Sequence, residues 1–204
     1  NLALIIHSNS FPSLKNEDTG FGTMNSSAGL EVIDYISGVF NMLQLGPAGK
    51  TKSCDSSPYT STIFSINPLF IDLKALTTKE WNNLLSEETF QEIVNDNPNK
   101  NRNKTAYAYI VNAQERALHE AFENFKKLQP QKMVKEFEEY KKDNAYWLDK
   151  DAIYEALTIE HNNDYWPMWK NEDDKHLFNA DTNEDRIKFG NRIQEIEKKY
   201  SDDI

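Results

Sequence analysis

Cysteine is almost absent from this sequence, since Cys54 is the single thiol among 204 residues. One cysteine excludes a disulfide framework within the chain, which favours a reducing compartment. No histidine lies near Cys54 in the sequence, so we interpret it as a small loop residue rather than a catalytic nucleophile. The histidines, His7, His119, His161 and His176, are scattered, and none has a partner at the spacing of zinc ligands. We therefore expect neither a metal nor a cofactor.

Basic residues and long apolar runs are also scarce. Lys and Arg number 23 against 33 Asp and Glu, and the net charge of -10 argues against nucleic acid or an anionic membrane as a partner. No apolar run approaches the roughly 20 residues that a membrane-spanning helix needs. The apolar start, residues 2–6, is short and lacks the basic residues of a secretory signal. These deficits predict a cytoplasmic protein.

Hydrophobic residues make up 38% of the chain, enough for a packed core, and the first part of the chain mixes short apolar runs with loops. Residues 2–7 are typical of a strand buried on both faces, residues 28–39 have a helical apolar spacing, and residues 40–45 are a second strand candidate. This order predicts a β-α-β unit. Residues 69–71 are a candidate for a further short strand. We assign residues 1–76 to this part.

The second part, residues 77–204, is strongly charged and mostly helical by its apolar periodicity. Its helices are expected at residues 78–85, 87–94, 106–128, 131–142, 150–160 and 183–200. The fold class is therefore α/β, with a β-α-β start followed by a helical region.

Acidic residues are abundant, but none forms a convincing site. Residues 181–185 begin like a calcium-binding loop, yet Arg186 and Arg192 stand where that loop needs glycine and glutamate. We expect Thr182 or Asn183 to cap a helix instead. With 33 carboxylates in the chain, chance alone brings acidic pairs close in sequence, so no pair is assigned to acid–base chemistry.

Three short motifs follow one another in the first part of the chain. They are Leu-Gly-Pro-Ala-Gly at residues 45–49, Ser-Pro-Tyr-Thr-Ser at residues 57–61 and Asn-Pro-Leu-Phe-Ile-Asp-Leu at residues 67–73. Their order resembles the amylomaltase family of 4-alpha-glucanotransferases, glycoside hydrolase family 77. In that family a Leu-Gly-Pro turn ends the second barrel strand and precedes a Ser-Pro-Tyr loop and an Asn-Pro segment. Residues 50–56 make this loop longer than in most members.

The resemblance extends along the chain in both directions. Residues 4–12 are similar to the family's first strand and the loop after it, and residues 20–23 are similar to its Gly-Ile-Gly turn. Residues 117–122, 147–157 and 166–169 resemble parts of the family's inserted subdomain. Each motif is short, and their joint order carries the resemblance.

The resemblance implies a (β/α)8 TIM barrel with a large, mostly helical insertion, and this chain would contain only the first part of that barrel. It also implies transfer of an α-1,4-glucan segment to another sugar hydroxyl by a retaining mechanism with a covalent intermediate. In the family the catalytic carboxylates lie on later barrel strands, and a full barrel takes about 250 residues or more. We therefore expect the chain that ends at Ile204 to be inactive alone, and we name no catalytic residue.

Two residues are carried over from the family as substrate contacts. Tyr59 matches the tyrosine that stacks on the sugar near the scissile bond, where a ring can cover the CH face of glucose. Ser57 matches a serine that contacts substrate through its hydroxyl or backbone. Without the resemblance, this segment would be an ordinary turn with a half-buried tyrosine. Trp166 and Trp169 are further candidates for glucan contact, although two aromatic residues at a helical spacing more often belong to a core.

Other functions stay open at this point. A non-catalytic glucan-binding or regulatory protein could keep the start of the barrel, whereas an unrelated helical interaction domain would have no affinity for maltooligosaccharides. A partial barrel would also expose a strand edge and apolar surface, which predicts self-association.

Overall fold

The computed structural model describes residues 1–51, 57, 59, 65–100, 102 and 104–201. The chain divides into two compact units, Asn1–Val134 and Lys135–Ile204, and each unit has its own hydrophobic core. The division expected from the sequence, at residues 76 and 77, follows a change of composition rather than contacts between residues. That boundary stays a prediction about where the barrel start gives way to the insertion.

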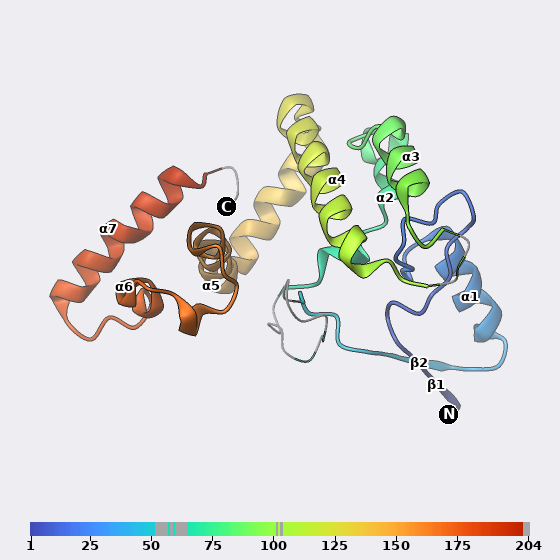
Figure 1. Ribbon diagram of the computed structural model, residues 1–204, viewed down its shortest axis with the longest axis horizontal. Coiled ribbons are helices and arrows are strands. Elements are labelled where there is room, and N and C mark those ends of the chain that lie inside the picture. Colours follow the sequence, from blue (N-terminus) through green and yellow to red (C-terminus); the bar gives the residue numbers. More distant parts are fainter. Residues whose placement is uncertain (52–56, 58, 60–64, 101, 103, 202–204) are drawn as a thin grey trace. The chain divides into compact units, whose positions relative to one another are not determined.

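The first unit begins with the predicted β-α-β arrangement. Strands β1 (Ala3–Ile6) and β2 (Met42–Leu45) pair in parallel along all four residues, and α1 (Ser27–Ser37) connects them (Figure 1). Parallel strands require such a crossover. Helix α1 begins where the hydroxyl of Ser26 accepts the backbone N–H of Gly29 at 3.1 Å, which satisfies one of the free donors of the first turn.

The prediction that the first strand is buried on both faces is wrong for the described residues. Ile5 is 73% exposed, Met42 is 52% exposed, and both strands alternate between exposed and half-buried residues. A parallel strand is buried on both faces only when further elements cover both sides of its sheet. No described element covers the face that carries Ile5. The two strands pair only with each other in the described part of the chain, so each has an unpaired edge.

The other regular elements described in the first unit are helices. They are η2 (Pro68–Phe70), α2 (Leu73–Leu76), η3 (Lys79–Trp81), α3 (Glu87–Asp96) and α4 (Tyr107–Leu128). Helix α4 packs against η2, α2 and α3. Their apolar faces bury the side chains of Phe70, Leu85, Phe90, Ile93, Ile110 and Ala117, among others. This core holds the segment that follows β2 against α4.

Two segments of the first unit differ from the sequence-based prediction. Residues 69–71 do not form a strand, because Asn67 caps a 3-10 turn and Pro68 occupies its first position. The fixed backbone angle of proline suits the start of a helical turn. Residues 78–85 were expected to form a helix, but only Lys79–Trp81 is helical, and Asn82 then adopts a left-handed backbone conformation (φ 55°) that ends the turn.

The second unit consists of helices around a smaller core. Helix α5 (Gln131–His161) runs into it from the first unit and is followed by η4 (Trp166–Met168), α6 (Glu172–His176) and α7 (Asn183–Lys199). The buried core side chains are Ile153, Ala156, Leu157, Trp169, Leu177, Phe189 and Ile196. Among the described residues, no helix has the length and apolar content that crossing a membrane requires.

The long helix α5 replaces two helices that the sequence predicts, at residues 131–142 and 150–160. The intervening residues contain no glycine or proline, so nothing in the chain ends the first helix. The start of α7 agrees with the prediction. The hydroxyl of Thr182 accepts the N–H of Asp185 at 3.1 Å, and the carboxylate of Asp185 accepts the N–H of Thr182 at 3.0 Å, which together form a capping box.

Candidate functional site

The carboxyl ends of β1 and β2 lie close together. The fully buried hydroxyl of Ser8 donates to the carbonyl of Gly46 at 3.2 Å. A Cβ atom at Gly46 would lie 3.2 Å from the imidazole of His7, so glycine allows this close approach. In α/β enzymes, substrate sites form at the carboxyl ends of parallel strands. The segment that follows β2 is therefore the natural place to look for a site.

The loop between residues 49 and 66 is closed at its base by hydrogen bonds between its two ends. Lys50 donates its backbone N–H to the carbonyl of Ser65 at 3.1 Å. Asn67 donates its backbone N–H to the carbonyl of Ala48 at 2.7 Å. An isolated antiparallel bridge joins the same two chain segments. The loop thus leaves and re-enters the fold at one point.

Side chains also tie the base of this loop to α4. The hydroxyls of Thr51 and Tyr107 are hydrogen-bonded to each other, and Tyr107 is the first residue of α4. The buried side chain of Asn67 donates to Thr51 Oγ1 at 3.2 Å and accepts the N–H of Leu69 at 3.0 Å. Asn67 begins one of the family motifs, but the sequence does not predict that it meets Thr51 and Tyr107, because their meeting depends on contacts between distant segments.

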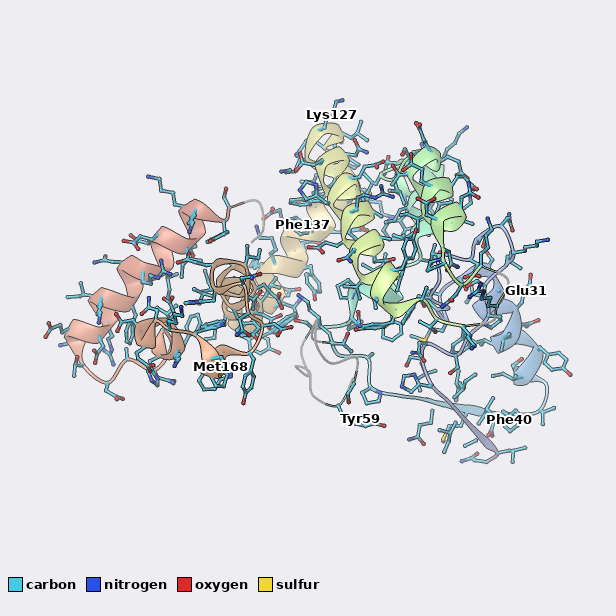
Figure 2. All side chains as sticks on the ribbon, viewed as in Figure 1. Glu31, Phe40, Tyr59, Lys127, Phe137 and Met168 are labelled. Atoms are coloured by element: carbon cyan, nitrogen blue, oxygen red, sulfur yellow. The ribbon has the colours of Figure 1, made fainter. Side chains whose placement is uncertain are left out.

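The two residues expected to contact substrate both lie on this loop. Tyr59 is 79% exposed, and its ring is not buried in the turn (Figure 2). The backbone N–H of Tyr59 lies 3.4 Å from the hydroxyl of Ser57, a long and weak hydrogen bond. Cys54 and residues 58, 60 and 61 of the motif lie outside the described residues. The exposure of Tyr59 leaves its ring accessible to a ligand, and its role as a sugar contact stays a prediction.

The two tryptophans that are candidates for glucan contact, Trp166 and Trp169, have different environments. Trp169 is buried, and its ring stacks on those of Tyr154 and His161 with centroid separations of 5.7 and 4.7 Å. Trp166 is 49% exposed, at the start of η4. The prediction that such residues belong to a core is thus confirmed for Trp169 and wrong for Trp166.

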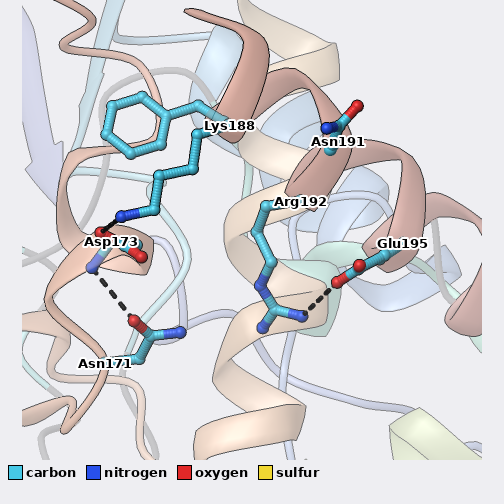
Figure 3. A pocket seen from close by; sticks show the side chains of 7 residues that line it. Asn171, Asp173, Lys188, Asn191, Arg192 and Glu195 are labelled. Carbon is cyan, nitrogen blue, oxygen red and sulfur yellow. Dashed lines mark hydrogen bonds and ion pairs between the residues drawn. The ribbon is translucent and has the colours of Figure 1, made fainter. Parts of the chain in front are cut away.

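A small open hollow of about 290 Å³ lies in the second unit (Figure 3). Its charged side chains pair with one another, since Lys188 lies 2.7 Å from Asp173 and Arg192 lies 3.6 Å from Glu195. The lining residues are Asn171, Asp173, Lys188, Phe189, Asn191, Arg192 and Glu195. Because these charges neutralise each other, the hollow does not have the converging unpaired groups of a substrate site.

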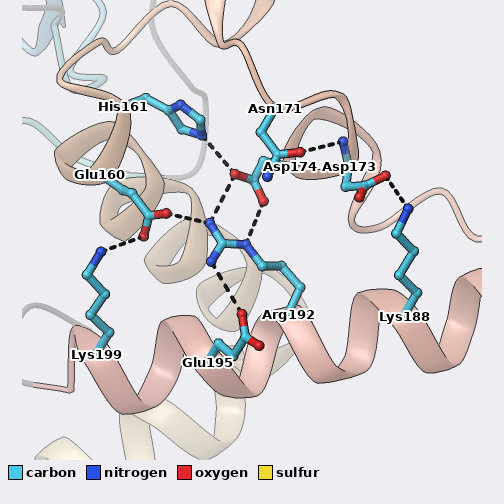
Figure 4. Close-up of polar contacts among 9 residues, drawn as sticks. All are labelled: Glu160, His161, Asn171, Asp173, Asp174, Lys188, Arg192, Glu195 and Lys199. Atoms are coloured by element: carbon cyan, nitrogen blue, oxygen red, sulfur yellow. Dashed lines mark hydrogen bonds and ion pairs between the residues drawn. The ribbon is translucent and has the colours of Figure 1, made fainter.

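Behind this hollow, charged side chains connect α5, α6 and α7 (Figure 4). Arg192 Nε donates to Asp174 Oδ1 at 2.8 Å, and Arg192 Nη2 donates to Glu160 Oε1 at 2.6 Å. His161 Nε2 lies 2.8 Å from the other oxygen of Asp174, and Lys199 lies 3.1 Å from Glu160. The side chain of Asp174 is fully buried. We call these five residues the Arg192 network.

The acidic members of the Arg192 network are held in their ionised forms. Burial alone would raise the pKa of Asp174, but hydrogen bonds from Arg192 and His161 outweigh it and lower the pKa below the usual 3.8. Burial also opposes ionisation of Glu160, whose pKa is lowered below 4.5 by hydrogen bonds from Arg192 and Lys199. With every charge paired, this network is suited to holding helices together rather than to proton transfer.

No metal centre is found in the part of the chain that the structure describes, where no three His, Cys, Asp or Glu side chains are arranged to hold an ion. Among the described residues, the chemically distinctive feature is therefore the exposed ring of Tyr59 in the segment that follows β2. A parallel β-α-β start, a loop at the carboxyl end of its second strand and a long helical region together place the described chain in the α/β class.

Comparison with known proteins then gives the family. The family model of 4-alpha-glucanotransferases, glycoside hydrolase family 77, matches residues 9–200. The chain belongs to this family, which confirms the resemblance seen in its loop motifs.

Two relatives show how much of such a protein the chain represents. The chain is 31% identical over 151 residues to a 4-alpha-glucanotransferase of Clostridium butyricum. These aligned residues cover 74% of this chain and 29% of that protein. The chain is 28% identical over 131 residues to a 4-alpha-glucanotransferase of Thermus thermophilus. These aligned residues cover 64% of this chain and 23% of that protein. The chain thus matches less than a third of the length of either relative.

Proposed function

We propose that this chain forms one wall of the donor-sugar site in a 4-alpha-glucanotransferase that moves α-1,4-glucan segments between maltooligosaccharides. The supporting observation is the exposed ring of Tyr59 on a loop that follows β2 and is fastened at its base. Family membership over residues 9–200 supports the activity of the whole protein. The parent fold we propose is a (β/α)8 barrel, of which β1, α1 and β2 are the first elements.

In this proposal the chain positions the sugar and does not supply the reacting carboxylates. The ring of Tyr59 covers the CH face of a glucose unit, and the hydroxyl of Ser57 hydrogen-bonds a sugar hydroxyl. A carboxylate elsewhere in the parent protein attacks the anomeric carbon, while a carboxylic acid protonates the departing glycosidic oxygen. A sugar hydroxyl of the acceptor then displaces the enzyme carboxylate, so the anomeric configuration is retained. Alone, the chain would bind glucan without transferring it.

Substitution of Tyr59 tests the sugar contact. We expect Tyr59→Ala to weaken maltotriose binding in titration calorimetry by about 1 kcal/mol, roughly fivefold, because one stacking ring is lost. Tyr59→Phe should retain most of the affinity, since its ring can still stack. Tyr35→Ala is a matched control, because Tyr35 lies on α1 and is 85% exposed.

Unchanged maltotriose affinity in Tyr59→Ala would remove this residue from the proposed site. Equal weakening by Tyr59→Ala and Tyr35→Ala would also contradict the proposal, because it would indicate a general effect on folding. Binding alone fits a non-catalytic glucan-binding protein as well, so transfer activity requires a separate test, the disproportionation of maltotriose.

A further inference from the structure

A buried amide on α4 binds the turn that follows the loop between residues 49 and 66, which we call the Tyr59 loop. Gln114 is 3% exposed, and its Nε2 donates to the carbonyl of Pro68 and to the carbonyl of Ile71, at 3.0 Å each. A glutamine amide has two N–H donors, and here both bind the backbone of η2 and the residue after it. Because an unpaired buried polar group costs free energy, these hydrogen bonds fix where η2 lies against α4.

Side chains from another segment hold η2 as well. The carbonyl of Phe70 accepts hydrogen bonds from the buried hydroxyl of Thr23 at 3.2 Å and from the side-chain amide of Asn25 at 3.1 Å. The rings of Phe21 and Phe70 pack with their centroids 5.7 Å apart. This turn is therefore bound by polar side chains from α4 and from the segment before α1.

The position of η2 determines where the Tyr59 loop rejoins the fold. Asn67 caps η2, and its backbone N–H donates to the carbonyl of Ala48 at 2.7 Å. The side chain of Asn67 donates to Thr51 Oγ1 at 3.2 Å. The contacts that hold η2 therefore also hold Asn67 and, through it, the base of the loop.

Helix α4 contacts the base of the loop at a second point. The hydroxyl of Tyr107 is hydrogen-bonded to the hydroxyl of Thr51, and Tyr107 precedes Gln114 by about two helical turns. Residues at this spacing lie on the same face of a helix. One face of α4 thus holds the start of the Tyr59 loop through Tyr107 and the turn after its end through Gln114.

We propose that Tyr107 and Gln114 are positioning residues of the donor-sugar site, which act through Thr51 and η2 on the loop that carries Tyr59. Neither residue contacts the sugar in this account. A ring that is already held in its binding position loses less freedom when a ligand stacks on it, so its affinity is higher than that of the same ring on a loosely held loop. This inference rests on the proposed function, in which Tyr59 is the sugar contact.

The first test is calorimetric titration of the 204-residue chain with maltotriose. We expect Gln114→Met to weaken binding about two- to fivefold, because methionine keeps the bulk of the side chain but donates no hydrogen bond to η2. Asn124→Leu is the matched control. The amide of Asn124 also joins α4 to a backbone carbonyl, that of Leu84 at 2.8 Å, but not to the Tyr59 loop or η2. This control should keep the maltotriose affinity of the unsubstituted chain.

A second pair of variants perturbs the fold less, because each removes a single hydroxyl. Tyr107→Phe loses the hydrogen bond to Thr51 and should weaken maltotriose binding about twofold. Tyr109→Phe is its control, since the hydroxyl of Tyr109 donates to the carbonyl of Ile93 at 2.8 Å. If Gln114→Met is unfolded at the titration temperature by circular dichroism, this second pair decides the inference.

Double variants separate positioning from a general loss of structure. If Gln114 and Tyr107 act through the ring of Tyr59, then Gln114→Met or Tyr107→Phe should not weaken binding further when Tyr59→Ala is already present. A general effect on folding would instead weaken binding by the same factor with and without Tyr59→Ala, and this result would overturn the inference.

The remaining outcomes distinguish this inference from the proposed function. Unchanged maltotriose affinity in both Gln114→Met and Tyr107→Phe, together with weakened binding in Tyr59→Ala, would overturn the inference and leave the proposed site intact. Equal weakening by Tyr107→Phe and its control Tyr109→Phe would also overturn it. Absence of maltotriose binding by the unsubstituted chain would overturn the proposed site and this inference together.

Discussion

At the scale of single residues, burial determines which charged side chains contribute most to the stability of the fold. The side chain of Asp174 is fully buried and paired with Arg192 and His161, whereas the adjacent Asp173 is 42% exposed and paired with Lys188. Two neighbouring carboxylates thus have very different surroundings. An exposed ion pair adds little to stability, but loss of one partner from a buried pair leaves an uncompensated charge.

We predict that Asp174→Asn lowers the free energy of unfolding of the second unit by about 3 kcal/mol, because Arg192 loses its buried partner. Asp173→Asn, the control at the neighbouring position, should cost less than about 1 kcal/mol. Urea unfolding followed by circular dichroism measures both values. Similar losses in the two variants would show that burial of Asp174 is not the deciding factor.

The lowered pKa values of Asp174 and Glu160 predict acid sensitivity. When the folded-state pKa lies below the unfolded value, the unfolded chain binds more protons, so stability falls as the pH falls. The contribution is present above the usual values of 3.8 and 4.5 and is lost as the pH drops through the lower folded-state pKa values. Arg192→Met should reduce this acid dependence, and Lys188→Met should not. Melting curves recorded from neutral pH to about pH 3 test this prediction. If the melting temperature of Arg192→Met falls with pH as steeply as that of the unsubstituted chain, the prediction is wrong.

At the scale of helices and strands, the sequence predicts elements best where local signals decide them. The β-α-β start was predictable because apolar runs and helical spacing are properties of short segments. The cap at Thr182 was predictable because hydroxyl residues before a helical pattern favour caps. Residues 69–71 differ from the prediction, because their apolar composition suggests a strand whereas Asn67 and Pro68 determine a 3-10 turn.

Local sequence signals did not predict which side chains are buried. Trp166 and Trp169 stand three residues apart, yet only Trp169 reaches the rings of Tyr154 and His161. The Arg192 network was likewise invisible, because its members come from three helices far apart in sequence. In the candidate site, Tyr59 and Ser57 could be predicted through family motifs. The hydrogen bonds that close the base of the loop could not be predicted from the sequence.

The capping box of α7 gives a prediction at this scale. Thr182→Ala should destabilise the second unit by about 1 kcal/mol, because a backbone donor of the first turn loses its partner. Thr182→Ser should be nearly neutral, since it keeps the hydroxyl that accepts from Asp185. Thermal or urea unfolding measures the difference. Equal stability of the Ala and Ser variants would show that the cap contributes nothing.

At the scale of the whole molecule, β1 and β2 pair only with each other among the described residues, which leaves one edge of each strand unpaired. These unpaired edges and the exposed Ile5 invite association with another chain. We predict that the 204-residue chain self-associates and that Ile5→Lys reduces this association, because a charge on the strand opposes pairing. Val39→Lys is the control, since Val39 is 66% exposed just beyond α1. Sedimentation velocity measures the oligomeric state of the three proteins, and a monomeric unsubstituted chain would contradict the prediction.

The central claim is that this chain is part of a 4-alpha-glucanotransferase. The most direct measurement is to express the source reading frame through the codons that follow Ile204 and to incubate the product with maltotriose. The account predicts disproportionation, with glucose and longer maltooligosaccharides formed together, while the 204-residue chain alone produces neither. A stop codon directly after Ile204, or an extended protein that binds maltotriose without transfer, would contradict the enzyme assignment and favour a glucan-binding role.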